Sequence, residues 1–149
     1  MLGIANGGIP LARRLCARAG IRRVGDLDIS FHRDDIGRHP IPKEFTPTLL
    51  PGDVNGATVL LVDDVLFSGR TVKAALDELF DHGRPAKVEL AVLVDRGSRK
   101  LPIVADFSGT TLSAREGEEV VVSLGDDPSQ DQIVIRARGP RAERAAARR

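Results

Sequence analysis

The feature that most constrains the fold of this 149-residue sequence is a strand–helix–strand pattern between residues 58 and 94. Residues 58–62, Thr-Val-Leu-Leu-Val, form a continuous aliphatic run, which is typical of a strand buried on both faces of a sheet. Apolar residues then recur at helical spacing from Thr71 to His82, and Gly83 provides a helix stop. Residues 88–94 form a second aliphatic run. The pattern predicts a β-α-β unit with parallel strands.

Segments on both sides extend this unit into one α/β domain with a mainly parallel sheet flanked by helices. We predict further strands over residues 1–5, 24–31, 102–107, 119–124 and 132–136, and a helix over residues 10–19. Residues 33–56 contain four prolines, and we expect them to form a long mobile loop of functional importance. The domain is predicted to span residues 1–136, followed by a flexible tail over residues 137–149.

The composition restricts the core and the compartment. The chain has no Trp, no Tyr and only five Phe, so its core has to be aliphatic. Its single cysteine, Cys16, excludes a disulfide framework and a cysteine-based zinc site. No apolar run approaches the roughly 18 residues of a membrane span, so we expect a cytoplasmic protein without membrane attachment. The three histidines are interpreted as surface residues, since no pair has metal-ligand spacing.

The tail concentrates positive charge in a chain whose net charge is only +1. Six arginines and one acidic residue, Glu143, lie between Arg136 and Arg149. One interpretation is a solvated, frayed terminus. The alternative is an electrostatic arm for RNA or another polyanion. The tail has no aromatic side chain to stack on bases, so it is not expected to read a nucleotide sequence.

The segment between the first buried strand and the following helix carries the candidate chemistry. Asp63 and Asp64 end the strand, at the edge of the sheet where α/β proteins bind ligands. A helix N-terminus can hold a phosphate, and Gly69 lets the backbone approach it closely. The hydroxyl groups of Ser68 and Thr71 can donate to phosphate oxygens or cap the helix. The segment therefore predicts a phosphate site beside two carboxylates.

The two carboxylates need a reason to lie beside an anion that they repel. They can accept hydrogen bonds from sugar hydroxyls, or they can hold Mg²⁺. The implied ligand is a ribose that carries a phosphate. The alternative is that Asp63 and Asp64 cap a turn and face water.

These residues resemble a known signature. The run Val-Leu-Leu-Val-Asp-Asp-Val-Leu-Phe-Ser-Gly-Arg-Thr at residues 59–71 is similar to the phosphoribosyl-pyrophosphate (PRPP) motif of type I phosphoribosyltransferases. Residues 94–103, from Val-Asp-Arg-Gly to Leu-Pro-Ile, and residues 27–35 resemble the PyrR family within that superfamily. The resemblance covers residues 2 to about 135. PyrR proteins are described as pyrimidine operon regulators and uracil phosphoribosyltransferases.

The resemblance implies a type I phosphoribosyltransferase fold with a mobile loop and a small hood. It implies a Mg²⁺-dependent reaction of uracil with PRPP that yields UMP and pyrophosphate. Asp63 and Asp64 would hold the ribose 2′- and 3′-hydroxyls, directly or through the metal. The other implied site residues are Asn6, Gly7 and Gly8 in a pyrophosphate-binding turn, Arg33 at the root of the mobile loop, Leu66, Phe67, Ser68, Gly69, Arg70 and Thr71 around the 5′-phosphate, and Val94, Asp95, Arg96 and Ile103 near the base.

Two of these assignments have plainer alternatives, and three functions stay open. Arg33 can be a solvated loop charge, and Asp95 can cap the turn at Gly97. The chain can be an enzyme, a UMP- or PRPP-sensing regulator that binds pyrimidine-leader mRNA through the basic face of a dimer, or a phosphoribosyltransferase for another base. A regulator that binds PRPP or UMP without catalysis is a variant of the second.

The sequence departs from the PyrR pattern in two places. Its turn is Ala5-Asn6-Gly7-Gly8, where PyrR proteins usually carry Thr-Arg or Arg-Arg before the glycine. That arginine would help to neutralise the leaving group, although many phosphoribosyltransferases have Gly-Gly turns. Family members also have a helix and the start of the first strand before the position of Met1. Either the start of the chain is assigned too late, or the chain is naturally short. We expect a naturally short chain to be less stable or to depend on assembly into a homodimer or larger oligomer.

Overall fold

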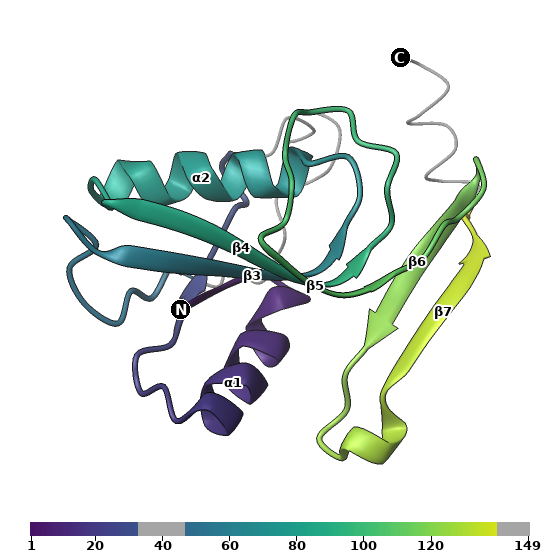
Figure 1. Ribbon diagram of the computed structural model, residues 1–149, viewed down its shortest axis with the longest axis horizontal. Coiled ribbons are helices and arrows are strands. Elements are labelled where there is room, and N and C mark those ends of the chain that lie inside the picture. Colours follow the sequence, from purple (N-terminus) through teal and green to yellow (C-terminus); the bar gives the residue numbers. More distant parts are fainter. Residues whose placement is uncertain (33–46, 140–149) are drawn as a thin grey trace.

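A five-stranded, all-parallel sheet forms the centre of the computed structural model, which describes residues 1–32 and 47–139 (Figure 1). Its strands are β1 (Leu2–Ile4), β2 (Gly25–Leu27), β3 (Thr58–Leu66), β4 (Lys87–Asp95) and β5 (Phe107–Thr111), in the order β2-β1-β3-β4-β5. The pairs β1–β2, β1–β3, β3–β4 and β4–β5 are all parallel. The predicted α/β class and the predicted β-α-β unit are therefore confirmed.

Helices α1 (Gly8–Ala19) and α2 (Arg70–His82) cover opposite faces of this sheet (Figure 1). The alternation of side chains along β3 explains the arrangement, because successive residues of a strand point to opposite faces. Leu61 belongs to the core that contains Leu79 of α2. Its neighbour Val62 belongs to the core that contains Leu11 and Ala12 of α1. Because the strand is apolar on both faces, it packs against α2 on one face and against α1 on the other.

A separate antiparallel hairpin stands beside the main sheet. It consists of β6 (Glu118–Ser123) and β7 (Gln132–Ala137), which are joined by a short 3₁₀ helix, η2 (Pro128–Gln130). Arg14 of α1 reaches this connection and pairs with the carboxylate of Asp131. The predicted strands at residues 119–124 and 132–136 are confirmed, each within one residue at its ends.

The predicted strand over residues 102–107 is wrong, because β5 begins only at Phe107. Ile103 packs instead against the core beneath α2. Asp106, directly before β5, is bound to β4: its carboxylate accepts a hydrogen bond from the backbone N–H of Leu90 at 2.8 Å. Its own N–H donates to the Leu90 carbonyl at 2.9 Å. These two hydrogen bonds attach the chain to β4 directly before the first β4–β5 ladder pair, Ala91 with Phe107.

The predicted strand over residues 24–31 is shorter than expected. After Leu27, the N–H of Asp28 donates to the hydroxyl of Thr48 at 3.0 Å instead of joining the ladder. Residues 33–46 of the predicted loop lie outside the described residues, as do residues 140–149 of the predicted tail. Within the described part of the chain, neither helix is long and apolar enough to cross a membrane.

Candidate active site

Asp63 and Asp64 lie at the carboxyl end of β3, within the strand rather than after it. Asp63 is 5% exposed, and its Oδ1 accepts a hydrogen bond from the N–H of Asp64 at 3.0 Å. Burial, followed by the charge of Asp64, raises the pKa of Asp63 well above its ordinary value. Asp64 is half-buried, and its Oδ1 accepts from the N–H of Val65 at 2.8 Å. A buried Asp63 does not fit the alternative of two turn caps that face water.

The turn Asn6-Gly7-Gly8, between β1 and α1, lies directly against this carboxyl end. A Cβ atom on Gly7 would sit 2.2 Å from Oδ2 of Asp64, and one on Gly8 would sit 2.0 Å from the carbonyl oxygen of Val62. Only glycine fits at such distances. The peptide bond between Ala5 and Asn6 is cis. The structure thus places the predicted pyrophosphate turn beside Asp64, as a site shared between them requires.

The predicted phosphate loop, residues 66–71, links the same end of β3 to α2. Gly69 has a φ of 92° and forms the N-cap of α2, a conformation that L side chains rarely adopt. The hydroxyl oxygen of Ser68 accepts a hydrogen bond from the N–H of Arg70 at 3.3 Å. The first amides of a helix have no partner within the helix and point toward an incoming anion. The loop therefore ends in a backbone suited to a phosphate.

The segment 98–103 folds over this loop and fixes its backbone. The N–H groups of Lys100 and Leu101 both donate to the carbonyl of Ser68 at 3.0 Å. The side chains of Leu101 and Ile103 lie 3.3 Å from the position that a Cβ on Gly69 would take. Ile103 thus packs on the phosphate loop, while Val94 is fully buried within the sheet.

Arg99 is the part of this site that the sequence reasoning missed. Its guanidinium donates to Oδ2 of Asp95 at 2.6 Å and to the carbonyl of Phe67 at 3.1 Å, and its Nε donates to the carbonyl of Ile103 at 2.9 Å. The hydrogen bond from Arg99 is the main cause that lowers the pKa of Asp95. The other oxygen of Asp95 accepts from the N–H of Gly97 at 2.8 Å, which is the turn-capping role considered above. Asp95 and Arg99 together hold the loop backbone.

Arg96 connects the phosphate loop to the β6–β7 hairpin. It is 6% exposed, and its guanidinium carbon lies 3.9 Å from the ring centre of Phe67. The same group donates to the carbonyl oxygens of Glu118 at 3.0 Å and Arg115 at 3.3 Å. Burial is the main cause that lowers the pKa of Arg96, and the charge of Arg138 adds to it. Its Nε has no hydrogen-bond partner among the described residues.

Of the remaining predicted site residues, the structure describes Arg70 and Thr71 but not Arg33. Arg70 and Thr71, the last two residues of the predicted phosphate loop, form the start of α2. Arg33 lies outside the described residues, so its place near the pyrophosphate stays a prediction. Asp63, Asp64, the glycine turn and the phosphate loop meet at one edge of the sheet, where the parallel strands end.

Comparisons with known proteins agree with this geometry. Residues 1–128 match the family described as "Phosphoribosyl transferase domain". The chain is 47% identical over 149 aligned residues to the "Bifunctional protein PyrR" of Leifsonia xyli subsp. xyli, which covers 93% of this chain and 81% of the relative. It is 50% identical over 141 residues to the protein of the same description from Chloroflexus aurantiacus, with 91% and 77% covered.

Solved structures show the same fold. A hypoxanthine phosphoribosyltransferase of Staphylococcus aureus superposes with a TM-score of 0.61 at 21% identity, over 95% of this chain and 76% of that one. A purine phosphoribosyltransferase of Pyrococcus horikoshii gives a TM-score of 0.56 at 25% identity, over 74% and 68%. The family match and the shared architecture indicate a phosphoribosyltransferase domain. The identity of nearly one half to the PyrR relatives narrows the family further. The chain belongs to the phosphoribosyl transferase domain family and, within it, to the PyrR proteins.

Proposed function

We propose that this chain is a uracil phosphoribosyltransferase that converts uracil and PRPP into UMP and pyrophosphate. The observation that carries the proposal is the meeting of three features at the carboxyl end of β3. These are the Asp63–Asp64 pair, the turn at residues 6–8 and the phosphate loop at residues 66–71. PRPP has three groups that match them: ribose hydroxyls, a pyrophosphate and a 5′-phosphate. In this proposal the Asp63–Asp64 pair would hold the ribose hydroxyls, the turn would hold the pyrophosphate and the loop would hold the 5′-phosphate.

In this reaction the bond between C1′ of the ribose and the pyrophosphate oxygen breaks, and a bond from C1′ to N1 of uracil forms. Uracil loses the N1 proton, and pyrophosphate leaves with the bonding electrons. Positive charge develops on the ribose, so the chain has to place and orient groups rather than form a covalent intermediate. Asp64 is half-buried beside the Gly7 backbone, which supports a role in which it would accept a hydrogen bond from a ribose hydroxyl next to the leaving pyrophosphate.

Magnesium fits this donor set. Asp63 and Asp64 provide carboxylate oxygens, the ligands that Mg²⁺ prefers, and like charges on adjacent carboxylates favour a cation between them. When bound, Mg²⁺ would offset the negative charge of the pyrophosphate. The chain's own part is to hold the phosphates by backbone amides at the turn and at the start of α2.

The choice of uracil rests on the relatives. The solved purine phosphoribosyltransferases share the fold at 25% identity or less, whereas the PyrR relatives are 47–50% identical. The candidate base segment, residues 94–103, is part of the sequence that resembles PyrR. Uracil is therefore the substrate we propose, with a purine or another base as the outcome that would correct it.

The test is UMP formation by the purified chain from uracil, PRPP and Mg²⁺, beside the variant Asp64→Asn. We expect the wild type to form UMP and the variant to lose at least a hundredfold in turnover while its circular dichroism is unchanged. An active Asp64→Asn protein would refute the site assignment. Binding of PRPP without any UMP would favour a sensor that lacks catalysis, and turnover of only another base would correct the substrate.

A second function, RNA-binding control of pyrimidine genes, is favoured by the relatives' description as bifunctional and by exposed arginines. Four exposed arginines lie on and after α1: Arg13, Arg18, Arg22 and Arg23. Neutralising a phosphate with each would make binding to a pyrimidine-leader RNA fall steeply with salt. A homodimer would present two such surfaces to one RNA.

We expect UMP to tighten this RNA binding. We also expect the double variant Arg22→Ala/Arg23→Ala to weaken it and to reduce the salt slope by about two. The variant Arg136→Ala is the matched control, since its side chain is exposed on the hairpin and paired with Glu119. No binding to the leader RNA at low salt would exclude the second function.

A further inference from the structure

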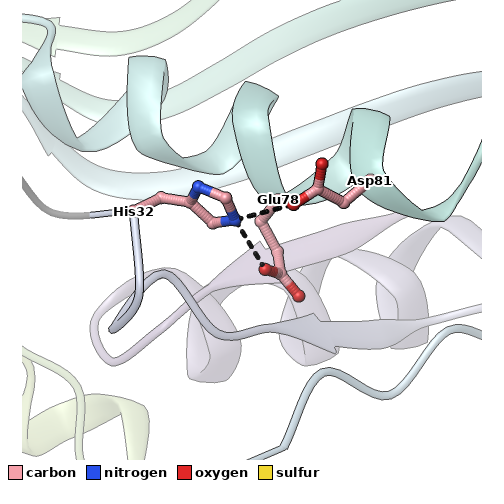
Figure 2. A group of neighbouring side chains, drawn as sticks. All are labelled: His32, Glu78 and Asp81. Carbon is pink, nitrogen blue, oxygen red and sulfur yellow. Dashed lines mark ion pairs between the residues drawn. The ribbon is translucent and has the colours of Figure 1, made fainter.

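Three side chains with metal-binding chemistry, none of them in the candidate active site, meet beside α2 (Figure 2). His32 follows β2 in sequence, and Glu78 and Asp81 lie three residues apart near the end of α2. Nε2 of His32 lies 3.2 Å from Oε2 of Glu78 and 3.0 Å from Oδ2 of Asp81. A search of the sequence for pairs of histidines at metal-ligand spacing does not find this group. Here one histidine meets two carboxylates, and His32 and Glu78 are 46 residues apart in the sequence.

Hydrogen bonding alone accounts poorly for this arrangement. One imidazole nitrogen faces two carboxylate oxygens, and a single N–H group can donate only one well-aligned hydrogen bond. The ligand atoms of Glu78 and Asp81 also lie within 4.8 Å of each other, so their charges repel. A cation at the centre would remove the competition for one N–H group and the repulsion between the carboxylates. The imidazole nitrogen and both carboxylates would then each bind the cation as ligands.

The distances suit a tetrahedral transition-metal ion. Zinc binds histidine nitrogen and carboxylate oxygen at about 2.0–2.2 Å, which separates neighbouring ligand atoms by roughly 3.3 Å in a tetrahedron. The distances of 3.0 and 3.2 Å from Nε2 of His32 are close to that value. An imidazole with two carboxylates also suits zinc better than Mg²⁺ or Ca²⁺, which prefer oxygen ligands alone.

Neighbouring groups orient Glu78, the most buried of the three side chains. The hydroxyl of Thr48 donates to Oε1 of Glu78 at 2.7 Å, and Nε2 of His82 lies 3.0 Å from the same oxygen. Such partners fix a ligand's direction in metal sites. The side chain of Glu78 is 15% exposed and that of Asp81 is 69% exposed, so an ion can enter from the solvent side.

We propose that His32, Glu78 and Asp81 form a binding site for Zn²⁺ or a similar divalent transition metal, with water completing the coordination. The site is separate from the candidate active site. Glu78 lies eight residues after the start of α2 at Arg70, which corresponds to about 12 Å along the helix axis at 1.5 Å per residue. The ion would tie the segment that follows β2 to the far end of α2.

The test is titration of the purified chain with ZnCl₂, followed by calorimetry, without PRPP and with millimolar Mg²⁺ to occupy oxygen-only sites. We expect one ion per chain and a rise in the unfolding temperature when zinc is added. His32→Ala and Glu78→Gln should each weaken binding at least tenfold and remove that rise. Unfolding of both variants without zinc checks that they fold.

Asp77→Asn is the matched control on the same helix, because Asp77 pairs with Lys73 and takes no part in the site. It should bind zinc as the wild type does. So should Asp64→Asn, which makes the result independent of the proposed activity. The proposal is overturned if zinc does not bind in a one-to-one ratio, if His32→Ala and Glu78→Gln bind it unchanged, or if Asp64→Asn alone abolishes binding.

Discussion

Replacing Arg99 by alanine should loosen the phosphate loop and destabilise the whole chain. The substitution removes a charge-assisted hydrogen bond to Asp95 and two well-formed bonds to the carbonyls of Phe67 and Ile103. A hydrogen bond to a charged group contributes about 1.5–3 kcal/mol and a neutral one about 1 kcal/mol, and water replaces part of each in a half-buried site. We therefore expect the free energy of unfolding to fall by about 2–4 kcal/mol.

Thermal unfolding and steady-state kinetics measure the two effects separately. In a chain of this length each kcal/mol moves the unfolding temperature by about 2–4 °C, so Arg99→Ala should unfold roughly 5–15 °C lower. On the proposed function, the loop would hold the 5′-phosphate both before and during the reaction. We therefore expect the KM for PRPP to rise about tenfold, with a smaller change in kcat. Arg136→Ala, an exposed arginine of the hairpin, should change neither quantity.

The pH dependence gives a further check on the same interaction. The hydrogen bond from Arg99 lowers the pKa of Asp95 in the folded chain, so the pair stabilises the fold above the unfolded pKa of about 3.9. That contribution is lost as the pH falls below 3.9 through the folded pKa. The stability difference between wild type and Arg99→Ala should narrow in that range. Surface substitutions usually change the free energy of unfolding by no more than about 0.5 kcal/mol. An Arg99→Ala protein that stays within about that range of the wild type would refute the reasoning.

Three further substitutions test other parts of the structure. Asp63→Asn should unfold at a higher temperature than wild type at pH 7 without Mg²⁺, because the raised pKa of Asp63 means that its ionisation destabilises the fold as the pH rises above 3.9. The same variant should lose most turnover, and an unfolding temperature equal to or below that of wild type would contradict the burial argument. Gly7→Ala would place a Cβ 2.2 Å from Oδ2 of Asp64, so UMP formation should fall at least tenfold. Gly139→Ala is the control, because a Cβ at Gly139 meets open space, and this variant should keep full activity. Leu61→Ala removes a fully buried side chain and should lower the free energy of unfolding, measured with urea, by about 2–5 kcal/mol. A decrease below about 1 kcal/mol, roughly the contribution of one methylene group, would mean that this core is not closely packed.

The central architecture could be predicted because it follows from local patterns. The aliphatic run at residues 58–62 and the helical spacing after Thr71 fix a parallel β-α-β unit. The same pattern predicted Asp63 and Asp64 at the carboxyl end of the strand, where the structure has them. These features depend on neighbours in sequence, and a sequence displays those directly.

Other features depend on contacts between distant segments, and the sequence does not display them. Residues 102–107 have a strand-like pattern, but Ile103 is apolar because it packs on the phosphate loop. The actual edge strand, β5, is exposed at every position and so has no pattern of burial. The role of Arg99 and the meeting of His32 with Glu78 likewise require the folded chain.

The division of the apolar interior into two cores has a consequence for how PRPP would act on the fold. The turn at residues 6–8 starts α1, and the loop at residues 66–71 starts α2, so each belongs to the helix that covers a different face of the sheet. A ligand held by both would be released when either face comes apart. It would therefore stabilise both layers by the same free energy and make them unfold as one cooperative unit.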